Sequence, residues 1–259
     1  MMKGVFDNKE SQKLACAKKE LLQTFLPGLI KAMKLKTCLD AGCGFGYFCG
    51  YFSALGLKVS AFDGRKENLE EAAGRFPGVA FHLGNVENEA ITDLGSFDIV
   101  GCLGLLYHLE NPMSAIRNLR RLTKKVCLIE TMINPSFSLS TILIEEGKGK
   151  DQGLNYLAQI PSERWMIKAL YKAGFAFVYR PKCLPEYKDF HERLFKRRSR
   201  IVLVASTEEL LAGEFKLCAE PAETNRYAWH PFGIGMILDN SKPIRFIKKI
   251  TNKDKKWSP

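Results

Sequence analysis

From residue 37 to about residue 132, short apolar runs alternate with stretches whose apolar residues recur at helical spacing. The runs have the length and composition of buried strands, and the stretches between them read as amphipathic helices. The expected strands are 37–41, 57–62, 79–83, 97–103 and 126–132. The expected helices are 45–55, 66–76 and 112–122, with a weak helical turn at 89–94. This alternation predicts a parallel sheet with helices on both faces.

Residues 133–160 interrupt this pattern, with Pro135, several serines and a glycine-rich stretch at 147–153. A long excursion in a compact domain is usually functional, so we expect a lid or a substrate wall here. Regular structure resumes with a helix from Pro161 to Ala173, which Gly174 ends. Two further strands, 175–179 and 201–205, bring the expected total in the sheet to seven.

The two ends of the chain differ from this central region. Residues 10–26 place apolar side chains on one face of a helix that we expect Pro27 to stop. The tail combines aromatic residues and glycines with a lysine-rich end. We therefore divide the chain into a helical segment (1–36), an α/β domain (37–206) and an accessory segment of undefined structure (207–259).

Composition excludes several classes of protein. The 259 residues are 46% hydrophobic, which is enough for a full core, yet no apolar run reaches the about 20 residues that cross a bilayer. No secretory signal pattern is present at the N-terminus, so we expect a cytoplasmic protein. The eight cysteines show no C-x-x-C spacing, and Cys38, Cys102 and Cys127 lie in apolar runs. Buried, reduced thiols and no metal site are therefore expected.

The formal net charge is +11, with lysines and arginines concentrated in several separate segments. Such an excess can attract an anionic partner such as nucleic acid, and it can equally be a generically basic surface. Charge alone does not choose between these two interpretations.

The strongest chemical signal is the sequence Leu39-Asp40-Ala41-Gly42-Cys43-Gly44-Phe45-Gly46, where the first strand turns into the first helix of the domain. Glycines let the backbone approach a ligand, and the helix start offers unpaired N–H groups. Dinucleotide loops read G-x-G-x-x-G, whereas the spacing here is G-x-G-x-G. Asp40 would repel a pyrophosphate but suits a ligand with an ammonium and a sulfonium. Asp63, which ends the second strand, can accept ribose hydroxyls and so indicates a nucleoside.

Over residues 37–206 the chain resembles the class I S-adenosylmethionine-dependent methyltransferases. This resemblance implies a Rossmann-like methyltransferase fold with S-adenosylmethionine as the cofactor. It implies that the glycine turn holds the methionine end of the cofactor, that Asp63 binds the ribose, that Asn85 and Val86 frame the adenine, and that the segment from Leu103 faces the methyl group. The cofactor-binding residues expected on this basis are Asp40, Gly42, Cys43, Gly44, Gly46, Asp63, Gly64, Asn85, Val86 and Leu103.

Two neighbouring residues are candidates for catalysis. His108 could accept a proton from an attacking hydroxyl or amine, or it could only hydrogen-bond its own loop. Tyr107 could place its ring against the sulfonium, or it could simply pack. Glu130 and Asn134, at and beyond the end of the fifth strand, are weaker candidates for orienting an acceptor.

We therefore expect a methyltransferase acting on an oxygen or nitrogen nucleophile of a small-molecule or sugar-type acceptor. The order of the short motifs is also similar to that of the tRNA wobble-uridine carboxymethyltransferases. This similarity implies a carboxylated cofactor whose extra carboxylate involves Tyr107, with tRNA as the acceptor. A cofactor-binding protein without catalytic activity and a dehydrogenase remain alternatives. The oligomeric state is not predicted.

Overall fold

A computed structural model describes residues 8–149, 151–192, 198–210 and 213–222. The chain divides into two compact units, residues 1–220 and 221–259. The second unit lies almost wholly outside the described residues, and all the elements below belong to the first. That second unit contains the aromatic and glycine cluster expected in the tail.

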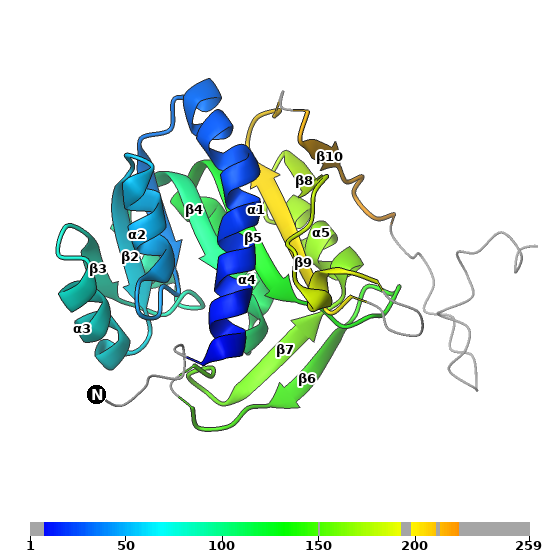
Figure 1. Cartoon of the computed structure of the whole chain (residues 1–259). Helices are drawn as coiled ribbons and strands as arrows, with labels where there is room; N and C mark the ends of the chain where they lie inside the picture. The colour runs from blue at the N-terminus through cyan, green and yellow to red at the C-terminus, as the bar shows by residue number, and fades with distance from the viewer. Residues whose placement is uncertain (1–7, 150, 193–197, 211–212, 223–259) are drawn as a thin grey trace, which may run out of the picture. The chain divides into compact units, whose positions relative to one another are not determined.

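Strands and helices alternate through the first unit (Figure 1). The strands are β1 (Thr37–Ala41), β2 (Lys58–Asp63), β3 (Ala80–Leu83), β4 (Phe97–Leu103), β5 (Thr123–Met132), β6 (Thr141–Glu145), β7 (Leu157–Pro161), β8 (Phe177–Pro181), β9 (Arg200–Ser206) and β10 (Phe215–Leu217). The α-helices are α1 (Lys9–Met33), α2 (Tyr47–Ala54), α3 (Lys66–Arg75), α4 (Pro112–Leu122) and α5 (Glu163–Lys172). Short 3-10 helices are η2 (Glu89–Leu94), η3 (Leu106–His108) and η4 (Lys188–Phe190).

Within the described part of the chain the main sheet has eight strands, in the order β10-β8-β9-β5-β4-β1-β2-β3. Strands β1 to β5 pair in parallel, while β9 runs antiparallel to both β5 and β8. The Rossmann-like fold expected from the sequence is thus confirmed. The sheet has one strand more than the seven expected, because β10 adds to β8 from a segment that carries no clear strand pattern.

Apolar side chains cover both faces of this sheet. One cluster joins α1, α2 and α3 to the sheet through residues such as Leu26, Phe52 and Leu69. The other cluster joins α4 and α5 to the opposite face through residues such as Leu119 and Met166. Figure 1 shows α1 crossing in front of the central strands. The two-sided burial explains why the central strands read as continuous apolar runs.

The sequence predicts that the first helix ends at Pro27, but the structure shows that it does not. α1 continues through Pro27 to Met33 and closes on Lys34, whose φ of 53° is left-handed. Proline removes one backbone N–H bond from a helix interior. Here the buried face continues past it, from Phe25 and Leu26 to Leu29, so packing outweighs the lost bond.

The interruption at residues 133–160 has more regular structure than the sequence indicates. β6 and β7 pair there as an antiparallel two-stranded sheet. Asn134 stabilises its base by donating from Nδ2 to the carbonyl oxygen of Ile160 at 2.8 Å. Alternation is weak in both strands, which is why the composition alone suggested a loop.

Two further expectations concern the whole chain. Among the residues with described positions, no helix is long and apolar enough to cross a membrane. All eight cysteines lie in this part of the chain as free thiols, and Cys38, Cys102 and Cys127 are buried as expected.

Candidate active site

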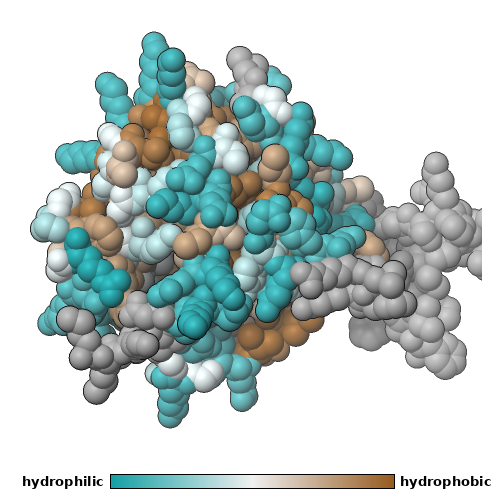
Figure 2. All heavy atoms as spheres, in the orientation of Figure 1, coloured by the Kyte–Doolittle hydropathy of each residue, from teal (hydrophilic) through white to brown (hydrophobic). Residues whose placement is uncertain are grey.

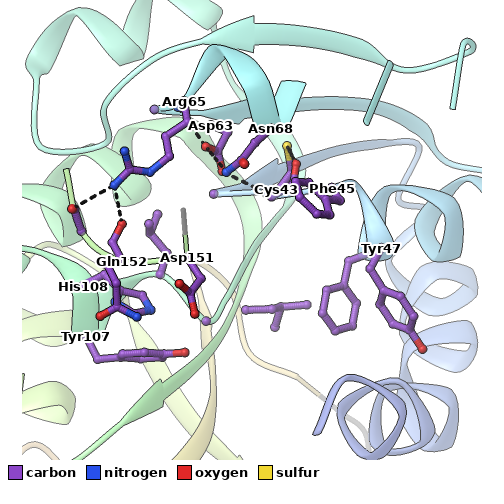
Figure 3. A pocket seen from close by; sticks show the side chains of 18 of the residues that line it. Cys43, Phe45, Tyr47, Asp63, Arg65, Asn68, Tyr107, His108, Asp151 and Gln152 are labelled. Atoms are coloured by element: carbon purple, nitrogen blue, oxygen red, sulfur yellow. Dashed lines mark hydrogen bonds between the residues drawn. The ribbon is translucent and has the colours of Figure 1, made fainter. Parts of the chain in front are cut away.

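A cavity of about 730 Å³ opens at the carboxyl ends of β1, β2 and β4 (Figure 3). Along the chain the strands proceed outward from β1 to β3, and then return to the other side of β1 with β4. Ligands in open α/β sheets bind at such a reversal of strand order. One wall comes from α1, through residues that include Leu14, Ala15 and Lys18.

The glycine turn after β1 forms the floor of this cavity. Gly42, Gly44 and Gly46 have φ values of 70°, 51° and 79°, a left-handed backbone that favours glycine. A Cβ on Gly42 would lie 2.9 Å from the side chain of Leu105. Gly42 and Gly44 line the cavity, but Gly46 does not. Gly46 instead starts α2 and packs against Phe76, so its place in the motif is explained by packing within the fold.

Asp40 lies beneath this turn and lines the cavity while only 2% exposed. Its Oδ2 is 3.2 Å from the thiol sulfur of Cys49, which donates to it. Burial raises the pKa of Asp40 to about 7. The carboxyl group is therefore poised to ionise near neutral pH.

Asp63 ends β2 and organises the turn that follows (Figure 3). Its Oδ2 accepts the Gly44 backbone N–H at 2.9 Å, and its Oδ1 accepts the Arg65 N–H at 2.9 Å and the Asn68 amide at 3.0 Å. A carboxylate has about four acceptor positions, so roughly one is left for a ligand hydroxyl.

Asn68 was not anticipated from the sequence. Its side chain is buried and lines the cavity. Within the described structure its Oδ1 atom has no hydrogen-bond partner. A buried acceptor without a partner is costly, and a hydroxyl donor in the cavity would satisfy it.

The remaining residues expected at the cofactor also line the cavity. They are Cys43, Gly64, Asn85, Val86 and Leu103. Asn85 caps its own loop by accepting the Glu87 N–H at 2.9 Å, and Val86 is buried. Gly64 is in close contact with Leu154, because a Cβ there would lie 2.6 Å from the leucine side chain.

Tyr107 and His108 share the short helix η3 at the other end of the cavity, with their ring centroids 4.2 Å apart. His108 Nδ1 is 2.6 Å from Glu146 Oε1. Burial, together with Arg200, lowers the pKa of His108 by more than Glu146 and Asp151 raise it, which favours the neutral imidazole. Tyr107 lies against Arg200, whose guanidinium carbon is 4.9 Å from the ring centroid.

A buried ion cluster lies behind these two residues. Glu130 is fully buried, and its two oxygens are 3.0 Å from Lys18 Nζ and 2.7 Å from Arg200 Nη1. The side chains of Lys18 and Arg200 are 9% and 11% exposed, and both line the cavity. Two cations and one carboxylate give this cluster a formal charge of +1, and the carboxylates of Glu146 and Asp151 lie close by, around His108.

The sequence offered uneven signals for these residues. Glu130 stands inside an apolar strand, and a charge in that position indicates a buried partner. Lys18 lies on a helix rich in lysine, so no local feature distinguishes it. Asn134, a weaker candidate, belongs to the base of the β6–β7 hairpin and does not line the cavity.

Comparisons with known proteins agree with this geometry. Residues 39–129 match the family model described as "Methyltransferase domain". The chain is 31% identical over 93 residues to a ubiquinone biosynthesis O-methyltransferase of Vibrio parahaemolyticus, covering 34% of this chain and 40% of that protein. It is 36% identical over 93 residues to the corresponding Sodalis glossinidius protein, covering 34% and 37%. The match therefore spans about two fifths of the length of these relatives.

Solved structures extend the likeness of the fold. The N-terminal domain of EvdMO1, crystallised with SAH (S-adenosylhomocysteine) bound, has a TM-score of 0.55 at 21% identity, covering 70% of this chain and 79% of that one. The magnesium protoporphyrin IX methyltransferase of Synechocystis, also with bound SAH, has a TM-score of 0.54 at 17% identity, covering 78% and 88%. At these identities the solved structures show a shared fold, and the match to a methyltransferase domain rests on the family model over residues 39–129.

Proposed function

We propose that this protein is an enzyme that transfers a methyl group from S-adenosylmethionine to an oxygen or nitrogen atom of a small-molecule or sugar-type acceptor. The observation that carries the proposal is the cavity at the strand-order reversal, which joins the glycine turn and Asp63 to a second polar group, His108. The relatives with the word O-methyltransferase in their names favour oxygen as the acceptor atom.

The residues present fit this cofactor. The unpaired Oδ1 of Asn68 and the remaining acceptor position on Asp63 both suit the hydroxyls of a ribose. Asp40 and the backbone of Gly42 and Gly44 would hold the amino acid end. Asn85 and Val86 would hold the adenine. S-adenosylmethionine, when bound, supplies a methyl group already activated by its sulfonium.

The chain's own task is then to align the acceptor and exclude water, which provides most of the rate gain in such a reaction. Beyond Gly104 the cavity has apolar walls from Met132, Ile144 and Ile160. His108 also lines the cavity. These residues suit an acceptor with an apolar body and a hydroxyl or amine that loses a proton.

Ligand-dependent stability tests the proposal directly. SAH at 100 times its dissociation constant should add about 2.7 kcal/mol of stability. For a domain of this size that corresponds to about 5–11 °C in Tm. NAD at the same concentration serves as the control, and Asp63→Asn should remove most of the SAH effect. A Tm raised by NAD and not by SAH would favour the dehydrogenase alternative.

A second candidate rests on the buried ion cluster. Lys18 and Arg200 reach the cavity beside Tyr107, although an apolar acceptor requires no cation there. A cofactor with a carboxylate on its transferable group would use this charge, as the similarity to tRNA carboxymethyltransferases implies. The acceptor would then be a tRNA wobble uridine.

The two candidates differ in ligand preference. Calorimetry should compare S-adenosylmethionine with its carboxylated form on the wild type and on Arg200→Met. Tighter binding of the carboxylated form, lost in the variant, supports the second candidate. If the wild type and Arg200→Met each bind the two cofactor forms equally, the result supports the first candidate and contradicts the second.

A further inference from the structure

Glu146 connects the cavity histidine to a segment of chain far from it in sequence. Glu146 directly follows β6, and its side chain is only 5% exposed. Its Oε1 is 2.6 Å from His108 Nδ1, and its Oε2 accepts the Gly153 backbone N–H at 2.6 Å. One oxygen of this buried carboxylate therefore contacts His108, and the other accepts a hydrogen bond from Gly153.

Residues 151–156, here called the strap, are held at the opposite side by Arg65. Arg65 Nη2 donates to the carbonyl oxygens of Gln152 and Gly153 at 2.9 and 3.1 Å. The Arg65 backbone N–H donates to Asp63, so the arginine belongs to the same turn as the expected ribose ligand. Figure 3 shows Arg65 extending from beside Asp63 to the strap, close to His108.

Contact between the strap and η3 is close enough to require glycine. A Cβ on Gly153 would lie 2.2 Å from the backbone oxygen of His108 and 2.9 Å from Glu146 Oε2. Backbone cannot yield as a flexible side chain can, so the strap would have to move. Gly147, in the same connection between β6 and β7, has nothing within 4 Å of its Cβ position.

We propose that Glu146 is a positioning residue for methyl transfer, which keeps the proton of His108 on Nδ1 and so leaves Nε2 as the base, while the strap links this arrangement to the Asp63 turn. The inference rests on the proposed function. A carboxylate accepts Nδ1–H, and the imidazole lone pair is then on Nε2. Nε2 takes the proton of the acceptor as its oxygen or nitrogen bonds to the methyl carbon. The carbon–sulfur electron pair stays on sulfur, and the imidazolium later releases its proton to water.

Charged groups around His108 agree with this role. Burial lowers the pKa of His108, Glu146 and Asp151 raise it, and Arg200 on β9 lowers it, so that the net shift is downward. The imidazole is therefore neutral at pH 7, as a base must be. Without the charge of Glu146 the pKa would fall further.

Nitrogen NMR of histidine-labelled protein tests the positioning role without an acceptor. The chain has four histidines, and His108→Gln identifies the signals of this one. The wild type should show the neutral tautomer protonated on Nδ1. Glu146→Gln keeps an acceptor but no charge, so it should retain this tautomer and lower the pKa of His108. Glu146→Ala should give a mixture of tautomers. A wild-type His108 protonated on Nε2, or a tautomer unchanged in Glu146→Ala, overturns the proposal.

A matched glycine pair tests the link through the strap. Gly153→Ala should disturb the His108 tautomer as Glu146→Ala does, and Gly147→Ala should leave it as in the wild type. Equal spectra for the two alanine variants would refute the link. Calorimetry with SAH on each protein separates the proposals, because wild type that fails to bind SAH contradicts the proposed function. Wild type that binds SAH while Glu146→Ala leaves the His108 tautomer unchanged contradicts only this inference.

Discussion

Removal of the charge on Glu130 should destabilise the fold more than any surface change. Glu130 is fully buried on β5, and it is the shared partner of Lys18 on α1 and Arg200 on β9. Glu130→Gln keeps the shape of the side chain, but its amide NH₂ group would face either Lys18 or Arg200. The substitution therefore breaks an ion pair and leaves buried positive charge uncompensated.

The magnitude follows from this burial. Removing one partner of a buried pair costs about 3–5 kcal/mol, because the remaining charge stays desolvated. Lys18 retains its hydrogen bond to the Leu103 carbonyl oxygen at 2.9 Å, which favours the lower end of the range. In a domain of this size such a loss lowers Tm by about 6–20 °C.

Urea unfolding measures the effect, with the midpoint expected to fall at an unchanged m-value. Glu70→Gln is the control, since Glu70 pairs with Lys66 at 3.6 Å while the two side chains are 64% and 76% exposed. That exposed pair should contribute at most about 1 kcal/mol. A loss below about 1 kcal/mol in Glu130→Gln would mean that cavity water solvates Lys18 and Arg200, and the reasoning would be refuted.

The same cluster predicts a pH dependence. Burial alone would raise the pKa of Glu130, but Lys18 and Arg200 outweigh it and lower the pKa below 4.5. A lowered pKa in the folded state contributes stability above the unfolded pKa, and this contribution is lost as pH falls. The difference between wild type and Glu130→Gln should thus be constant from pH 7 to 5 and shrink below pH 4.5.

Three other predictions concern the cofactor side. Because burial raises the pKa of Asp40 to about 7, SAH binding at pH 6 should release a proton and be about tenfold weaker than at pH 8. Calorimetry in buffers of different ionisation enthalpy measures this, and an absence of proton release contradicts it. Gly42→Ala should abolish SAH binding through strain and contact with Leu105, whereas Gly56→Ala, with φ of 80° and open space, should cost about 1–2 kcal/mol of stability at unchanged affinity. Asn68→Leu should weaken SAH binding by about 1–3 kcal/mol, and unchanged affinity would remove Asn68 from the ribose site.

The gathering of the proposed cofactor residues around one cavity could be predicted from sequence because the signals are local. The glycine turn, Asp63 and Asn85 each lie at or just beyond the end of a strand, and parallel strands bring their carboxyl ends to one edge. Gly46 shows the limit of this reasoning. It belongs to the motif by spacing, but only the approach of Phe76, which directly follows α3, reveals that it packs inside the fold.

The other end of the cavity could not be assembled in this way, because its residues come from distant elements. Lys18, Glu146 and Arg200 lie on α1, after β6 and on β9, and each pairs with a residue far away in sequence. The hairpin of β6 and β7 was missed for a related reason. Its strands alternate weakly, so pairing between them rather than their composition determines the structure.

The positions of the site residues inside or outside the matched family segment limit what the relatives can indicate about the acceptor of this chain. The matched family segment, residues 39–129, contains the glycine turn, Asp63, Tyr107 and His108. Lys18, Glu146 and Arg200 all lie outside it. The residues that we propose for the cofactor thus lie mostly within the segment shared with the family, whereas the ion cluster and the strap include residues beyond it. Acceptor specificity in this chain should therefore follow from the ion cluster and the strap, and exchange of those residues should change the acceptor while SAH affinity is retained.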